Sequence, residues 1–266
     1  MIIKRTVIEK RNLRVDVVKG ADDQMIEYFS DTVLGTPGGL EYKHTSIKAK
    51  IENLGDVYFL VLKKDDTILG TVGLAKRMLY IGNHEFISWY IRYFAIRAPL
   101  RSNVHKKNKN QNGQSQGKGT GLFLKLGSSF IENPFLFEDE NKTTPSKSIV
   151  YSYIEKNNYR TVDFNNEMNL EAVRNFTTVL FSRFYPKEKK GVRKLKKDEI
   201  PGMSEKLSEY YHNYTMYSNR NLFFHEHYYV FEKDGQVIAG LQAYPDEWKI
   251  IDMPGRWGKL MFWLLP

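Results

Sequence analysis

The segment from His84 to Arg97 is apolar on both of its alternating faces, and it constrains the fold more than any other part of the sequence. One face of an extended chain here carries Phe86, Tyr90, Phe94 and Ile96, and the other carries Ile87, Trp89, Ile91 and Ala95. A strand with two apolar faces has to be covered on both sides. The pattern therefore predicts a central strand, and 41% hydrophobic residues supply enough apolar material for such a core.

Other strands and helices are expected on both sides of this segment. Upstream, the sequence predicts a strand at Leu13–Val18, helices from Asp22 and at Thr45–Asn53, and a hairpin formed by Val57–Leu62 and Thr67–Tyr80. Downstream, it predicts a helix at Leu122–Ile131, a strand at Ile149–Lys156 and a short helix at Asn157–Asn169. Residues 102–116 are polar and nearly free of apolar groups, which is typical of an inserted loop.

The second part of the chain repeats the order of the first. A strand at Val192–Lys197, a helix at Ile200–Tyr214 and a hairpin from Tyr228 to Tyr244 follow one another as the elements before Tyr80 do. This weak internal repeat predicts two domains, residues 1–187 and a partial second copy at residues 188–266. The apolar end of the chain, Met261–Pro266, is expected to form a strand separated from its neighbours.

Composition excludes several kinds of chemistry. The absence of cysteine rules out disulfides, thiolate zinc sites and cysteine nucleophiles, and we expect no metal site. The first residues lack an apolar signal core and no apolar run is long enough to cross a bilayer, so a cytoplasmic protein without membrane contacts is expected. The net charge of +9 allows a polyanionic partner, but no readout helix or stacking face accompanies the basic runs. Nucleic-acid binding therefore ranks behind the alternatives below.

The most informative motif is the glycine-rich turn Gln116-Gly-Lys-Gly-Thr-Gly121, which lies between an expected strand and an expected helix. Such a turn presents several backbone N–H groups to one point, which suits a phosphate. The spacing does not fit a P-loop, because Lys118 precedes Gly119. It does not fit the dinucleotide fingerprint either, because Leu122 stands where the third glycine belongs. An ordinary glycine loop capping a helix is the alternative reading.

The turn fits Gln-x-x-Gly-x-Gly, and with it the chain resembles the GCN5-related N-acetyltransferase (GNAT) superfamily. Members carry such a segment on the loop that enters the helix binding the coenzyme A pyrophosphate. Tyr93–Arg101 is similar to the family's fourth strand and following turn, although the polar insertion departs from the family's short connection. The resemblance covers roughly residues 13–184. It implies a GNAT-like α/β (α+β) fold, with a mixed, mostly antiparallel sheet flanked by helices.

The resemblance also implies where an acyl-CoA would bind. In the family, the glycine loop holds the pyrophosphate, and the pantetheine arm lies between the splayed fourth and fifth strands. These positions correspond here to Gln116, Gly117, Lys118, Gly119, Thr120 and Gly121 for the pyrophosphate, and to the backbone of Phe94, Ala95 and Ile96 for pantetheine. Asn158 either contacts the coenzyme or caps the short helix that follows it.

Acyl transfer from a thioester to an amine needs a base for the amine and an acid for the departing thiolate. Glu85 and Glu155, at the ends of the two strands, are the candidate bases, although a solvated strand-end charge also explains each. Many family members use a tyrosine seven residues after an asparagine as the acid, and no tyrosine stands there in this chain. Tyr159 or another phenol substitutes, or solvent protonates the thiolate, or the chain binds acyl-CoA without turning it over.

The expected function is an N-acyltransferase that moves an acyl group, by default acetyl from acetyl-CoA, to a primary amine by direct attack on the thioester. The acceptor would be a small molecule or a peptide, and a homodimer is compatible with the sequence. The alternative is a noncatalytic acyl-CoA-binding module with a regulatory or scaffold role.

Overall fold

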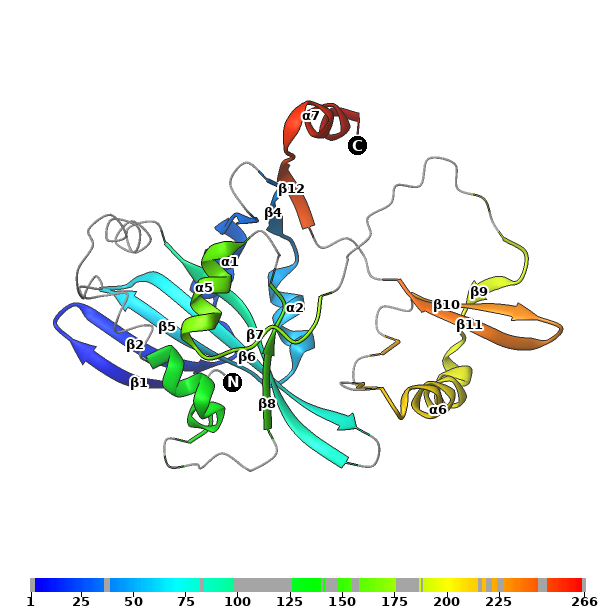
Figure 1. The fold of residues 1–266 in the computed structure, drawn as a ribbon, viewed down its shortest axis with the longest axis horizontal. Helices are drawn as coiled ribbons and strands as arrows, with labels where there is room; N and C mark the ends of the chain where they lie inside the picture. Colours follow the sequence, from blue (N-terminus) through cyan, green and yellow to red (C-terminus); the bar gives the residue numbers. More distant parts are fainter. Residues whose placement is uncertain are drawn as a thin grey trace. The chain divides into compact units, whose positions relative to one another are not determined.

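The computed structural model describes residues 3–35, 39–81, 84–97, 126–139, 141, 148–154, 158–175, 187, 189–214, 217–218, 222–223, 227–243 and 248–264. These residues form two compact units (Figure 1). Unit 1 comprises Met1–Met78, Phe86–Glu171 and Glu247–Pro266, and unit 2 comprises Leu79–Glu85 and Ala172–Asp246. The two units are described separately below.

Unit 1 is built on a six-stranded sheet with the order β1-β2-β5-β6-β7-β8. The strands are β1 (Ile3–Lys10), β2 (Leu13–Lys19), β5 (Val57–Lys64), β6 (Thr67–Ile81), β7 (His84–Ile96) and β8 (Ser148–Ser152). The pairs β1–β2, β2–β5 and β5–β6 are antiparallel, whereas β7 and β8 run parallel. The mixed, mostly antiparallel sheet expected from the sequence is therefore present, and β7 lies between two strands.

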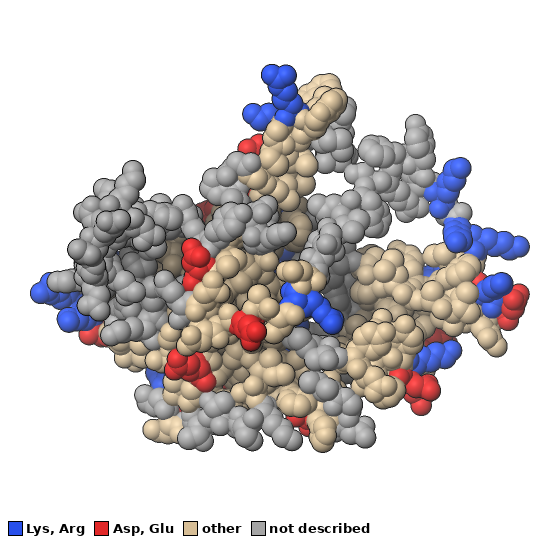
Figure 2. All heavy atoms as spheres, viewed as in Figure 1, with Lys and Arg blue, Asp and Glu red and all other residues tan. Residues whose placement is uncertain are grey.

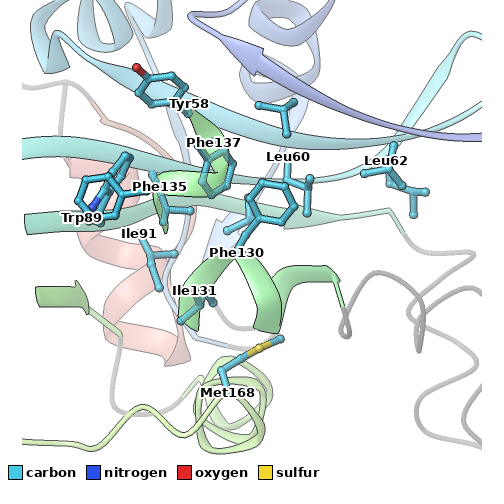
Figure 3. Packing of buried hydrophobic residues seen from close by; sticks show 14 residues of the cluster. Tyr58, Leu60, Leu62, Trp89, Ile91, Phe130, Ile131, Phe135, Phe137 and Met168 are labelled. Carbon is cyan, nitrogen blue, oxygen red and sulfur yellow. The ribbon is translucent and has the colours of Figure 1, made fainter. Parts of the chain in front are cut away.

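Alternation along the strands divides the core of unit 1 into two layers. On β5, Val57, Phe59 and Val61 face one layer, while Tyr58, Leu60 and Leu62 face the other. The first layer packs against α1 (Asp23–Asp31) and α2 (Ile47–Leu54). The second packs against helical residues 126–132, the 3-10 turn η1 (Pro134–Phe137) and residues near the end of α5 (Tyr159–Glu167). Figure 3 shows this second layer, with Phe130, Phe135, Phe137 and Met168 around the residues of β5 and β7.

A second, smaller sheet in unit 1 joins distant parts of the chain. Its order is β12-β4-β3, formed by β3 (Leu34–Gly35), β4 (Glu41–His44) and β12 (Trp248–Asp252). The helix α7 (Gly255–Leu264) follows β12. The prediction of a strand at Met261–Pro266 is wrong for the described residues, which end at Leu264. These residues continue the helix α7, which begins directly after Pro254. A short apolar run cannot be distinguished from part of a helix by periodicity alone.

Unit 2 contains a three-stranded sheet with the order β11-β10-β9 and one longer helix among its described residues. Its elements are β9 (Val192–Lys194), η2 (Lys197–Glu199), α6 (Ile200–Tyr211), β10 (Tyr228–Lys233) and β11 (Gln236–Gln242). Met203 of α6 packs on Tyr228 and Val230 of β10. The core of this unit thus lies between α6 and one face of the sheet.

The hairpins of the two units share an irregularity. The register of β5–β6 shifts between Leu62 and Lys63, and that of β10–β11 shifts between Phe231 and Glu232, in each case just before the turn. Each turn begins with an aspartate in the left-handed region, Asp65 in unit 1 and Asp234 in unit 2. The strand orders β2-β5-β6 and β9-β10-β11 also correspond. The domain boundary between residues 187 and 188 stays a prediction, and β12 and α7 belong with unit 1.

The charged side chains of the described residues do not gather in one patch on the face that Figure 2 displays, where Lys and Arg lie among Asp and Glu. The expected basic run at residues 101–118 lies outside the described residues. In the run at residues 187–197, Arg193 forms ion pairs with Glu199 and Glu232. These two carboxylates neutralise part of the positive charge that the sequence places there.

Candidate functional site

The ladder between the parallel strands β7 and β8 ends before β7 does. Its described pairs run from Ile87↔Ser148 to Ile91↔Ser152, while β7 continues to Ile96. On the other side of β7, the backbone N–H of Arg97 donates to Leu69 of β6. The resemblance puts the pantetheine arm of an acyl-CoA between these two strands, beyond the end of the ladder.

Just beyond this ladder end, the backbone of β7 is distorted. Tyr93 has a φ of 53°, in the left-handed region that non-glycine residues rarely adopt. Such a conformation costs on the order of 1–3 kcal/mol and persists only where the surrounding structure enforces it. Residues held in this way often lie at binding or catalytic sites.

Three neighbours hold Tyr93 in this conformation. The buried Thr71 hydroxyl of β6 donates to the Tyr93 carbonyl over 2.9 Å. Gly73 leaves room for the bend, because a Cβ there would lie 3.0 Å from the Arg92 carbonyl oxygen and 2.7 Å from the Phe59 ring. The Tyr93 ring packs on Phe29 of α1, with 5.0 Å between ring centroids. The distortion is therefore built into the packing between β6, β7 and α1.

A cluster of tyrosines and arginines lies beside the last pairs of the ladder. Tyr90 and Tyr151 are directly opposite each other and stack with their ring centroids 5.1 Å apart and their planes at 9°. Tyr153 meets both rings edge-on and is 59% exposed. The guanidinium carbons of Arg77 and Arg92 lie 5.5 Å and 5.9 Å from the Tyr90 centroid. Burial raises the pKa of both Tyr90 and Tyr151, so each phenol keeps its proton at neutral pH.

A buried lysine and a histidine lie on the other side of Tyr93. Lys50 of α2 is 3% exposed, and its Nζ is 3.2 Å from Nδ1 of His44 on β4. The His44 ring packs edge-on against Tyr93. Which of the two nitrogens donates depends on the tautomer of His44. Sequence reasoning missed this pair, although Lys50 interrupts the apolar stripe Ile47, Ile51 and Leu54, which was an available signal.

The residues expected to bind the coenzyme fall into three groups. The glycine-rich turn, with Gln116, Gly117, Lys118, Gly119, Thr120 and Gly121, lies outside the described residues. Phe94, Ala95 and Ile96 form the end of β7 beyond the ladder, and the side chain of Ala95 is buried among α1 and α2. Asn158 caps α5, because its side-chain oxygen accepts from the Thr161 N–H over 3.3 Å. Of the two roles expected for Asn158, capping the helix is the one that this hydrogen bond shows.

The expected catalytic residues are not brought together within the described part of the chain. Glu85 is exposed and lies on β7 before the ladder begins at Ile87, about 20 Å along the strand from Ile91. Glu155 lies outside the described residues. Tyr159 is the first residue of α5. The roles of these three residues stay predictions.

Two further properties concern metals and membranes. Among the described residues, no group of three or more His, Asp or Glu side chains could hold a metal ion. In the same part of the chain, no helix is long and apolar enough to cross a bilayer.

Comparison with known proteins gives a structural similarity but no match at the level of sequence. No protein-family model matches the sequence, and no curated protein matches it. Among solved structures, the crystal structure of Saccharomyces cerevisiae N-myristoyltransferase with bound myristoyl-CoA is similar, at 12% sequence identity and a TM-score of 0.39. The match covers 88% of this chain and 60% of that enzyme, so this chain spans less than two thirds of its length. A similarity at this level carries no conclusion about activity.

Proposed function

We propose that this chain is an N-acyltransferase that transfers an acyl group from acyl-CoA, with acetyl-CoA as the default donor, to a primary amine. The observation that carries the proposal is the ladder end at Ile91↔Ser152 followed by the left-handed Tyr93. The parallel ladder ends where β8 ends, and β7 continues past the distorted Tyr93, along the stretch where the resemblance places the pantetheine arm. The motif Gln116–Gly121 supports the proposal from the sequence, because it supplies N–H donors suited to a pyrophosphate.

In the proposed reaction, the amine nitrogen attacks the thioester carbonyl carbon. A C–N bond forms, the C–S bond breaks, the amine loses one proton to a base, and the coenzyme leaves as a thiolate that takes up a proton. Positioning of the amine beside the carbonyl supplies much of the acceleration, because it removes the entropy cost of bringing two reactants together. Phe94–Ile96 would hold the pantetheine arm through their backbone, and Gln116–Gly121 would hold the pyrophosphate.

The proton transfers are assigned to the residues that the sequence offers. Nδ1 of His44 already lies 3.2 Å from Nζ of Lys50, so His44 is not proposed as the base. Of the two carboxylates expected from the sequence, Glu155 is the first proposed base and Glu85 the second, because Glu85 lies about 20 Å along β7 from Ile91. Tyr159 remains the proposed acid for the thiolate, and the protonated phenols of Tyr90 and Tyr151 are further donors at the ladder end.

Calorimetric titration with coenzyme A tests the binding step, and release of free thiol from acetyl-CoA with a panel of amines tests turnover. Gly119→Asp places a carboxylate at the proposed pyrophosphate site, so the affinity should fall by more than about 100-fold. Gly113→Asp, with the same charge in the same segment, is the matched control and should bind normally. Absence of coenzyme binding in the wild-type chain would exclude the proposal. Tight binding without thiol release on any amine would favour the noncatalytic binding module.

A further inference from the structure

We propose that Arg77 and Arg92 bind an anionic group, a carboxylate or a phosphate, on the amine acceptor. The inference rests on the proposed function for the identity of the reaction, and it goes further by naming the chemical class of the acceptor. The four residues that form this site, Arg77, Tyr90, Arg92 and Tyr151, all belong to unit 1 and come from three adjacent strands.

The two arginines converge on one aromatic ring. Arg77 of β6 lies 5.5 Å from the Tyr90 centroid, and Arg92 lies 5.9 Å from the same centroid and 5.3 Å from that of Tyr93. Arg77 also interacts with the Tyr151 hydroxyl. Tyr90 and Arg92 are two positions apart on β7, so both side chains lie on the same face of the sheet. The geometry orders two guanidinium groups over a platform of stacked rings.

The charge of this pair is not balanced within the described residues. Neither arginine forms an ion pair with a described carboxylate, and both side chains are half-buried. Some other cations of the same unit do have carboxylate partners: Arg14 and Lys4 pair with Asp16, and Lys76 pairs with Glu138. Two like charges beside one ring repel each other, and the attraction of each to the ring offsets only part of that repulsion. A bound anion would relieve it.

The chemistry of the pair selects the kind of anion. A guanidinium group presents a planar fork of N–H donors that matches the two oxygens of a carboxylate or a phosphate. Contact with the Tyr90 ring restricts both arginine side chains before binding, so less side-chain entropy is lost when an anion binds. Tyr153, which is 59% exposed, lies at the edge of the ring cluster and brings it to the protein surface.

The location connects the pair to acyl transfer. Tyr90 and Tyr151 form the last pair but one of the β7–β8 ladder, and the ladder end is about 3 Å further along the strands. An acceptor held through its anionic group at Arg77 and Arg92 would therefore place its amine within reach of a thioester at Tyr93. Binding energy from this remote group would serve to position the amine rather than to react.

Matched amines test the inference in the full chain with saturating acetyl-CoA. The pairs are 6-aminohexanoate against hexylamine, β-alanine against propylamine, and O-phosphoethanolamine against ethanolamine. We expect kcat/KM to favour at least one anionic member by more than tenfold, and the pair that shows the preference distinguishes carboxylate from phosphate. Arg77→Gln and Arg92→Gln should each reduce that preference at least fivefold. Arg256→Gln, on the exposed surface of α7, is the matched control and should keep it.

The readout is a ratio within one enzyme preparation, so partial misfolding of a variant does not change it. Arg77→Lys and Arg92→Lys retain the charge but lose the fork, and an intermediate ratio is expected for both. If no amine is turned over, the same pairs are titrated into the coenzyme-bound protein and binding is followed by tyrosine fluorescence, with the same order expected. Equal use or equal binding of anionic and neutral amines would overturn the inference while leaving the acyltransferase proposal intact. Failure to bind coenzyme A would instead overturn the proposed function.

Discussion

Replacing Gly73 by alanine should disturb both the stability of unit 1 and the conformation of Tyr93. The added Cβ would lie 2.7 Å and 2.9 Å from two carbons of the Phe59 ring and 3.0 Å from the Arg92 carbonyl oxygen. Phe59 is fully buried, so its ring cannot turn away into solvent, and the backbone of Arg92 precedes the distorted residue. Overpacking of this kind costs about 1–3 kcal/mol of unfolding free energy.

Gly127→Ala provides the matched control in the same unit. A Cβ there would meet only the Met168 methyl at 3.4 Å, which is an ordinary contact with a flexible side chain. Because residue 127 lies in a helix, alanine should be neutral or stabilise by up to about 1 kcal/mol.

Urea unfolding followed by tryptophan fluorescence measures the difference in unfolding free energy between Gly73→Ala and Gly127→Ala for unit 1 alone. The four tryptophans of the chain, at positions 89, 248, 257 and 263, all belong to unit 1, so the signal is free of unit 2. We expect Gly73→Ala to lower the unfolding free energy relative to Gly127→Ala and to reduce acetyl-CoA turnover at saturating amine. Equal stability of the two variants, together with unchanged turnover, would refute the argument that Gly73 makes room for the bend at Tyr93.

Three further predictions rest on individual side-chain contacts. Asn158→Ala removes the N-cap of α5 and should cost about 0.5–2 kcal/mol in urea unfolding, whereas Asn158→Asp should cost less because aspartate also caps. Glu138→Ala leaves the half-buried Lys76 ammonium without its ion-pair partner and should cost about 1–3 kcal/mol, while an exposed Glu→Ala change should cost less than 0.5 kcal/mol. In unit 2, Arg193 and a backbone N–H lower the pKa of Glu199 to about 2. A carboxyl with a lowered folded-state pKa stabilises the fold above its unfolded pKa, so unit 2 should lose stability as the pH falls from about 4.5 to 2. Arg193→Gln should flatten that pH dependence, and an unchanged profile would contradict the assignment.

The strands with regular alternation could be predicted from the sequence, and those with interruptions could not. β5 and β7 were expected because apolar residues occupy both faces or alternate cleanly. β1 was missed because its apolar residues, Ile3, Val7 and Ile8, do not follow a period of two. The pairing of β4 with β12 was not predicted, because the two strands are far apart in the sequence.

The candidate site could be predicted in its chemistry but not in its geometry. The motif at Gln116–Gly121 predicted a phosphate cradle, which stays a prediction, and the resemblance based on it pointed to the end of the strand that contains Tyr93. Nothing in the sequence marks Tyr93 as left-handed, because that conformation depends on Thr71 and Gly73 of the neighbouring strand. The convergence of Arg77 and Arg92 on Tyr90 likewise depends on the register between strands, which single positions do not reveal.

The pairing of β4 with β12 affects the order in which the chain folds. The hairpins β1–β2 and β5–β6 join neighbouring segments and can form early, because short loops close at little entropic cost. The pair Trp248↔His44 joins segments separated by most of the chain, and the stacking of Trp248 on Tyr42 depends on it. During synthesis the residues around His44 would wait until Trp248 has emerged. The surroundings of the candidate site would therefore be completed last, after the sheet that supports them.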